Sequence, residues 1–225
     1  MKRLIAIIVT GALTLMFLLP NSSLATGVKG GIKIGVSSAK LHGEDVEELD
    51  DYLGEDLKSN TGICAAGFIT INITEMFAIQ PEVLYIKKGT KYEEGINGET
   101  GTLWFNLTYL EIPVLAKIMV PTQGSVKPFL FAGPAVALKL STKLKAEVGG
   151  DSIEVESEEL NEMLKGTDFG LVIGGGLDIG LGAPGTGSIS VDIRYSLGLT
   201  NIFDVEGEEI KVRNGAFSLM VGFSF

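Results

Sequence analysis

Seven charged residues stand out because each lies in a stretch that is otherwise apolar or small. In an extended strand they would project from the face opposite to the apolar one, since side chains alternate between two faces. A charge enclosed by protein is costly unless an opposite charge or a hydrogen bond meets it. We therefore expect these residues to form an interior network of ion pairs, or else to keep an interior polar through bridging water. They are Lys33, Glu82, Glu111, Lys117, Asp178, Asp192 and Arg194.

The chain has one histidine, His42, and one cysteine, Cys64. His42 suggests a lipid- or peptide-modifying enzyme as one alternative, but no spacing in the sequence brings a nucleophile and an orienting acid to it. Cys64 falls on the small-residue face of a strand, which favours a packing role. The glycine-rich segment GLVIGGGLDIG is not a phosphate loop, because alternation continues through it and no lysine follows. We predict no catalytic residue, no cofactor and no dedicated metal site.

Acidic residues outnumber basic ones, 28 to 18, and the net charge of −10 excludes a nucleic-acid-binding function. Most of the acidic residues lie in four long connections, residues 39–60, 89–102, 145–167 and 201–214. Such oxygen-rich segments suit Ca²⁺ or Mg²⁺, so divalent cations are a possible partner there, although the spacing matches no EF-hand loop. Two parts of these connections, EDVEELDDYL and ESEELNEMLKG, have apolar residues at helical spacing and predict short helices.

The elements that position the seven charges are predicted to be strands. The 225 residues include 30 glycines, and apolar residues recur at every second position in eight segments. In the last of them, AFSLMVGFSF, large apolar side chains alternate with small ones up to Phe225. The segments cover residues 28–37, 63–73, 77–85, 109–118, 129–140, 168–179, 188–199 and 216–225.

Short and long connections alternate along the chain. Three of the connections, such as GAPGTG, are short, and the four acidic ones are long. This arrangement is typical of an up-and-down antiparallel barrel whose two termini lie at the short-turn end, as in outer-membrane barrels with short periplasmic turns. The acidic connections would then be extracellular. The fold class predicted is all-β, an eight-stranded antiparallel up-and-down transmembrane β-barrel.

Volume decides which face of the strands points outward. An eight-stranded barrel has an interior just wide enough for small side chains to fill, and the large apolar set would not fit inside it. The small and polar faces do fit a narrow lumen, so the apolar faces are expected to meet lipid. In that lumen we expect Glu82 and Glu111 to lie near Arg194 or near the lysines Lys33 and Lys117. The resulting network would plug the barrel. A soluble periplasmic ligand-binding barrel, with its apolar face inward, is the rival.

Both ends of the chain carry further signals. Lys2 and Arg3 precede an apolar run from Leu4 to Leu19, and Ser23 and Ala25 follow at the small-residue positions of a cleavage site. Residues 1–25 therefore read as a cleaved signal peptide, with a retained membrane anchor as the alternative. Residues 26–225 are the predicted outer-membrane barrel domain. Aromatic residues near the strand ends are expected to form interfacial girdles. They are Phe77, Tyr85, Trp104, Phe105, Tyr195, Phe217, Phe223 and Phe225.

Five segments in order, FAIQPEVLYIKKG, YLEIPVLAK, PFLFAGPA, DIRYSLGLTNI and VGFSF, resemble strands of the porin-like, PorT-type outer-membrane β-barrel proteins of Gram-negative bacteria. The resemblance covers almost the whole mature chain. It implies an integral protein of the cell outer membrane, without an assigned activity for many members. The terminal Phe225 with Phe223 also looks like the signal by which the barrel-insertion machinery recognises its substrates.

These observations together predict a non-enzymatic envelope or surface protein with a narrow polar lumen and acidic extracellular loops. Its expected partners are outer-membrane lipid, lipopolysaccharide and the insertion machinery.

Overall fold

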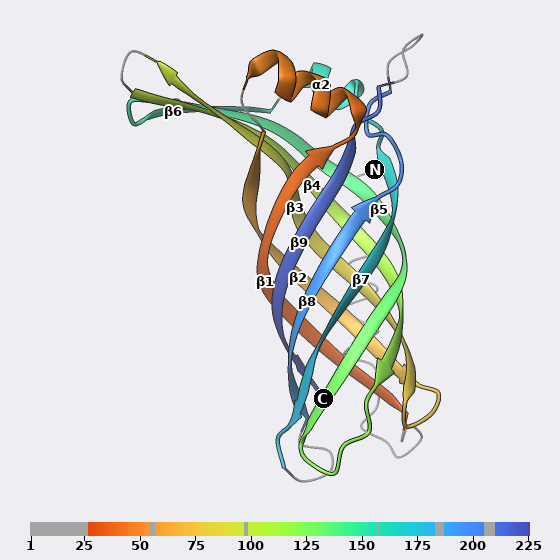
Figure 1. The fold of residues 1–225 in the computed structure, drawn as a ribbon. Helices are drawn as coiled ribbons and strands as arrows, with labels where there is room; N and C mark the ends of the chain where they lie inside the picture. Colours follow the sequence, from red (N-terminus) through yellow and green to blue (C-terminus); the bar gives the residue numbers. More distant parts are fainter. Residues whose placement is uncertain (1–26, 55–56, 97–98, 157, 183–186, 205–209) are drawn as a thin grey trace.

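The computed structural model describes residues 27–54, 57–96, 99–156, 158–182, 187–204 and 210–225. The predicted signal peptide, residues 1–25, lies outside them. Nine strands and two helices follow one another along the described chain (Figure 1). They are β1 (Val28–His42), α2 (Glu44–Leu53), β2 (Lys58–Asn72), β3 (Phe77–Ile96), β4 (Glu99–Met119), β5 (Val126–Val148), β6 (Asp151–Glu156), α3 (Glu158–Glu162), β7 (Thr167–Gly180), β8 (Ser188–Gly198) and β9 (Arg213–Ser224).

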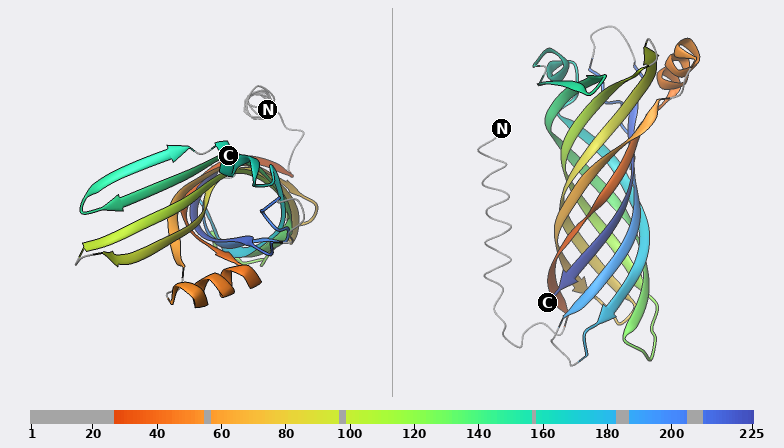
Figure 2. Two further views of the ribbon diagram at one scale, coloured as in Figure 1. Left: turned by 90° about the horizontal axis from the view of Figure 1, so that it is seen from above. Right: turned by 90° about the vertical axis from the view of Figure 1, so that its left-hand side faces the viewer.

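Eight of these strands close into a ring, and the ninth, β6, is attached outside it. Around the ring the order is β1, β2, β3, β4, β5, β7, β8 and β9, and β9 pairs with β1 again. Every pair is antiparallel. A view along the axis shows the closed circle (Figure 2, left). The predicted eight-stranded up-and-down barrel is confirmed, and closure leaves no unpaired edge within the wall.

The outer face of the wall is apolar. Ile34, Ile63 and Leu130 expose 67%, 70% and 65% of their surface, although they lie in the middle of strands. This band of exposed apolar side chains, the apolar belt, is the surface that a transmembrane barrel presents to lipid. The rival with its apolar face inward, a soluble ligand-binding barrel, is therefore wrong. Belt residues include Ile32, Val36, Ile71, Ile79, Tyr85, Val114, Ile118, Leu171, Ile173, Leu177, Val191, Ile193, Tyr195, Phe217, Leu219, Val221 and Phe223.

The two predicted helices are present at the outer end of the barrel. Helix α2 ends at Gly54, whose left-handed backbone (φ 68°) donates a hydrogen bond to the Asp50 carbonyl, and its Val46 is buried. Helix α3 is a short turn within the connection after β6. None of the helices in the described ranges is long and apolar enough to cross a membrane.

Of the predicted long loops, residues 89–102 are in fact mostly strand, and residues 145–167 are partly strand. Strand β3 continues to Ile96, and β4 already begins at Glu99. Strand β5 continues to Val148, and the chain then turns back into β6. We call this extension the arm: residues 87–96, 99–108, 141–148 and β6. Its base, which includes Lys88 and Leu107, still belongs to the barrel wall, and its outer part projects sideways from the outer end of the barrel (Figures 1 and 2). The loop prediction failed because the concentration of charged residues in these segments indicated solvated connections.

The outer mouth of the barrel is closed by apolar side chains. Wall residues Leu107 and Tyr109 pack with Leu164, Ile202 and other residues of the connections in one buried cluster. Phe105 packs against this cluster, so its predicted place in an aromatic girdle is wrong. The cluster, which we call the outer cap, also contains Leu41, Val46, Leu57, Val212, Ala216 and Met220.

Candidate functional site: a charge-filled lumen

The middle of the lumen holds two cations and two anions in direct contact. Arg194 of β8 places Nη1 2.5 Å from Oε2 of Glu82 on β3, and Nη2 2.9 Å from Oδ1 of Asp192. Lys33 of β1 lies 3.1 Å from Glu82 and 2.8 Å from Asp192. All four side chains are almost completely buried. This central layer is electrically neutral, as a buried group of charges must be to avoid a large desolvation cost.

Polar and aromatic neighbours complete the central layer. Gln80 donates a 2.6 Å hydrogen bond to Glu82 and accepts one from Thr70 at 2.9 Å. The Arg194 guanidinium lies 5.1 Å from the ring centroid of Phe131, and the Lys33 ammonium 4.9 Å from that of Phe68. Cations favour such positions over aromatic rings.

A second pair lies toward the short-turn end. Lys117 of β4 lies 2.9 Å from Asp178 of β7 and 3.8 Å from the ring centroid of Phe129. This lower pair is less enclosed, because the Asp178 side chain keeps 22% of its surface exposed.

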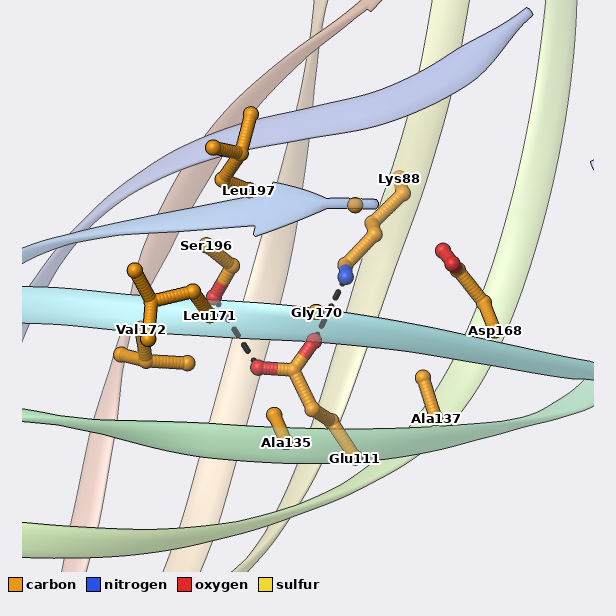
Figure 3. A pocket seen from close by; sticks show the side chains of 11 residues that line it. Lys88, Glu111, Ala135, Ala137, Asp168, Gly170, Leu171, Val172, Ser196 and Leu197 are labelled. Atoms are coloured by element: carbon orange, nitrogen blue, oxygen red, sulfur yellow. Dashed lines mark hydrogen bonds and ion pairs between the residues drawn. The ribbon is translucent and has the colours of Figure 1, made fainter. Parts of the chain in front are cut away.

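The third pair, on the outer side of the central layer, includes a residue that the sequence prediction missed. Lys88 of β3 lies 2.5 Å from Oε2 of Glu111, and Ser196 donates a 2.9 Å hydrogen bond to Oε1 (Figure 3). Asp168 projects toward the same small cavity, whose volume of about 10 Å³ is at the lower limit for holding one water molecule. Lys88 was missed because it lies beyond the predicted strand, which ended at Tyr85, and next to the connection expected to begin at residue 89.

The structure thus places the seven predicted charges in separate layers. It brings Lys33, Glu82, Asp192 and Arg194 together, joins Lys117 to Asp178, and gives Glu111 a different partner. Glu111 contacts neither Arg194 nor one of the predicted lysines among the ion pairs of the described residues. Its partner is Lys88.

A further polar group lies beside the third pair, under the outer cap. Asp168 accepts hydrogen bonds from Thr200 at 2.6 Å and from Asn214 at 3.0 Å. Asn214 also donates to the Tyr109 hydroxyl at 3.2 Å. The sequence pattern did place Asp168 on the inner face. Nothing in that pattern indicated Asn214 or Thr200, because both lie at the ends of a long connection.

The glycines of GLVIGGGLDIG belong to the wall at β7. A side chain at Gly174 or Gly176 would overlap the rings of Phe131 and Phe129, which fill the lumen there. These glycines therefore make room for the aromatic rings that lie against Arg194 and Lys117.

His42 lies outside the lumen, at the outer rim. It lines a groove of about 370 Å³ between α2 and the outer wall, together with Lys40, Tyr195 and Phe217. Burial lowers the pKa of His42, and the positive charge of Arg213 lowers it further. Among the described residues, no hydrogen bond joins His42 to a serine, threonine or acidic side chain. Cys64 is buried inside the barrel.

A metal-binding cluster is not formed by the described residues, in which no three His, Cys, Asp or Glu side chains gather in suitable positions. Part of the acidic connections lies outside the described ranges.

Comparison with known families agrees with this architecture. Residues 19–204 match the profile of the family described as the outer membrane protein beta-barrel domain. The chain therefore belongs to this family, and it is a protein of the outer membrane of Gram-negative bacteria. No curated protein sequence matched the chain.

Solved structures with a similar arrangement include three small barrels. Neisserial surface protein A is 16% identical, over 87% of this chain and 97% of its own, with a TM-score of 0.45. The attachment invasion locus protein Ail of Yersinia pestis is 14% identical, over 89% and 100%, with a TM-score of 0.42. OprG of Pseudomonas aeruginosa is 11% identical, over 88% and 94%, with a TM-score of 0.44.

Proposed function

We propose that this protein is a closed, non-enzymatic membrane anchor that presents its arm and acidic connections at the cell surface. The observation that carries the proposal is the central layer, in which Arg194 and Glu82 meet across the lumen with no exposed surface. The outer cap lies beyond it and the Lys117–Asp178 pair on the other side. An ion would have to break buried ion pairs and enter an apolar cluster to cross, which is unfavourable.

Conductance in planar lipid bilayers tests this proposal. The folded protein is expected to insert without producing stable current steps. The control is Lys117→Ser/Asp178→Ser, which removes the lower pair and leaves the central layer and outer cap in place, so it should also be silent. Long-lived steps of uniform size from the wild-type protein would contradict the closed lumen.

The non-enzymatic part of the proposal concerns His42. A general base needs a nucleophile within hydrogen-bonding reach and a group that orients it. His42 has neither among the described residues, and its groove is bordered by lysine and acidic side chains of α2 and β1. Outer-membrane lipids should therefore have the same composition whether cells produce the wild-type protein or His42→Gln. A lipid product that depends on His42 would favour the enzyme instead.

The narrower assignment to the PorT-type, porin-like group rests on the five strand segments quoted above. We also propose that the insertion machinery recognises Phe225 and Phe223, that lipopolysaccharide surrounds the outer half, and that divalent cations bind the acidic connections.

A further inference from the structure

The arm lies across the barrel axis. It extends sideways from the outer end of the barrel in the side view (Figure 1), and in the view along the axis its four strands lie side by side (Figure 2, left). The plane of this small sheet is thus roughly parallel to the membrane surface. One of its two faces must point back toward the outer leaflet.

Strand register identifies a charged face of the arm. Lys91 pairs with Trp104, Trp104 with Lys145, and Lys145 with Glu154. Directly paired residues project from the same side of a sheet, so these four share one face. Ion pairs place further residues on it: Glu93 lies 2.7 Å from both Lys58 and Lys91, and Lys143 2.6 Å from Glu154.

The opposite face of the arm is apolar. Tyr92 pairs with Leu103, Leu103 with Ala146, and Ala146 with Ile153. Tyr92 packs against the outer cap inside the barrel, as does Phe105. The apolar face therefore continues the inner wall, and the charged face continues the outer wall. Because the arm bends away from the axis, the continuation of the outer wall turns toward the membrane.

Strand register connects the charged face to the apolar belt. The hydrogen bond from Lys143 lowers the pKa of Glu154, and the charges of Lys143, Lys87 and Lys145 lower it further. Tyr85 is a residue of the belt, and Lys87, two residues nearer the arm, pairs with Thr108, which pairs with Ser141, two residues before Lys143. Lys87 follows Tyr85 on the same face and forms no ion pair within the described part of the chain. The lysines are thus at the height where lipid headgroups begin.

We propose that the charged face of the arm binds the phosphate groups of the phosphorylated glycolipid in the outer leaflet. Ammonium groups of Lys87, Lys143 and Lys145 match phosphates, and the glutamates between them match the divalent cations that bridge such phosphates. The face is also continuous with the lipid-facing wall. This inference depends on the outer-membrane location and not on whether the lumen conducts.

The single tryptophan of the chain is a reporter for this contact, since Trp104 lies on the charged face with the Lys145 ammonium 4.4 Å from its ring centroid. The full chain is placed in phosphatidylcholine vesicles, with or without a bis-phosphorylated lipid A and Mg²⁺. Trp104 fluorescence is then quenched with headgroup spin-labelled lipid and with aqueous acrylamide. We expect lipid A to increase quenching by the labelled lipid about twofold or more and to reduce quenching by acrylamide.

Two variants complete the test. Lys87→Gln/Lys143→Gln leaves Lys145 over the reporter ring and should abolish the response to lipid A. Lys29→Gln/Lys127→Gln removes the same charge near the short-turn end and should respond like the wild type. A heat-dependent gel shift verifies that each variant is folded. The proposal is overturned if Trp104 responds equally with and without lipid A, if Lys87→Gln/Lys143→Gln keeps the full response, or if phosphatidylglycerol at matched charge gives an equal response.

Discussion

Arg194 and Glu82 form a buried ion pair from strands on opposite sides of the ring. The contact spans the lumen, so it joins parts of the wall that share no backbone hydrogen bonds. Lys33 and Asp192 complete the layer and pair with each other as well. The layer has two positive and two negative charges, and the loss of any one of them leaves an uncompensated charge inside the barrel.

Removal of either Arg194 or Glu82 alone is therefore expected to lower the free energy of unfolding more than removal of both. Arg194→Met leaves Lys33 as the only full cation for Glu82 and Asp192, and should lower the free energy of unfolding by about 3–5 kcal/mol. Glu82→Leu should have a similar effect. In the double variant Lys33 still pairs with Asp192, so much of the loss should be recovered. Urea unfolding in lipid vesicles measures all three, and strictly additive losses would argue against the coupled layer.

Period-two alternation divided the residues of the predicted segments between two faces, and the fold class followed from it together with connection length and side-chain volume. Ile189 to Gly198 illustrates this, because alternation through the segment determines the side from which Asp192 and Arg194 project. Alternation does not determine height in the barrel. Glu82 and Glu111 share the inner face, but the stagger of the strands places one beside Arg194 and the other beside Lys88. Stagger depends on pairing around the whole ring, which one sequence does not encode locally.

The arm was not predicted for a different reason. Its segment LSTKLKAEV does alternate, with lysine and glutamate on one side and apolar residues on the other. The concentration of charge nearby indicated a solvated loop instead. The cross-strand ion pair of Lys143 on β5 with Glu154 on β6 stabilises strand pairing there.

A methyl group at Gly176 should destabilise the barrel. A Cβ atom there would overlap the Val191 carbonyl oxygen of the neighbouring strand and would lie 2.8 Å both from the Asp192 Cα atom and from the Phe129 ring, which fills the lumen. Overpacking of this kind costs about 1–3 kcal/mol. The matched control is Gly67→Ala, since a Cβ atom at Gly67 meets nothing within 4 Å. Thermal unfolding followed by the gel shift should distinguish the two variants, and equal midpoints would contradict a tightly packed lumen.

Acid should loosen the arm near Glu93. Hydrogen bonds from Lys58 and Lys91 lower the pKa of Glu93 from its ordinary value of 4.5 to about 2. Because the folded pKa is the lower one, the stabilisation is complete above the ordinary value and is lost as the pH falls from there toward 2. Hydrogen exchange in residues 87–96, corrected for intrinsic rates, should show less protection at pH 3 than at pH 5.

Glu93→Gln imitates the protonated carboxyl and should remove this dependence by lowering protection at pH 5. Glu94→Gln, a change at the exposed neighbour, is the control and should behave like the wild type. Unchanged protection between pH 5 and pH 3 in the wild type would mean that these hydrogen bonds do not hold the strands together.

Substitution of Phe225 can distinguish recognition by the insertion machinery from the stability of the folded barrel. Phe225 is 56% exposed, and its backbone pairs with Gly30 through two hydrogen bonds, which do not need the ring. If the ring is a recognition signal, Phe225→Ser should slow insertion by the reconstituted insertion machinery several-fold and leave spontaneous folding into detergent micelles almost unchanged. Phe217→Ser removes a ring of similar exposure, 49%, from the same outer face of β9. Because Phe217 is remote from the terminus, this control should insert at the normal rate, and an equal delay in both variants would attribute the effect to lost lipid contact instead.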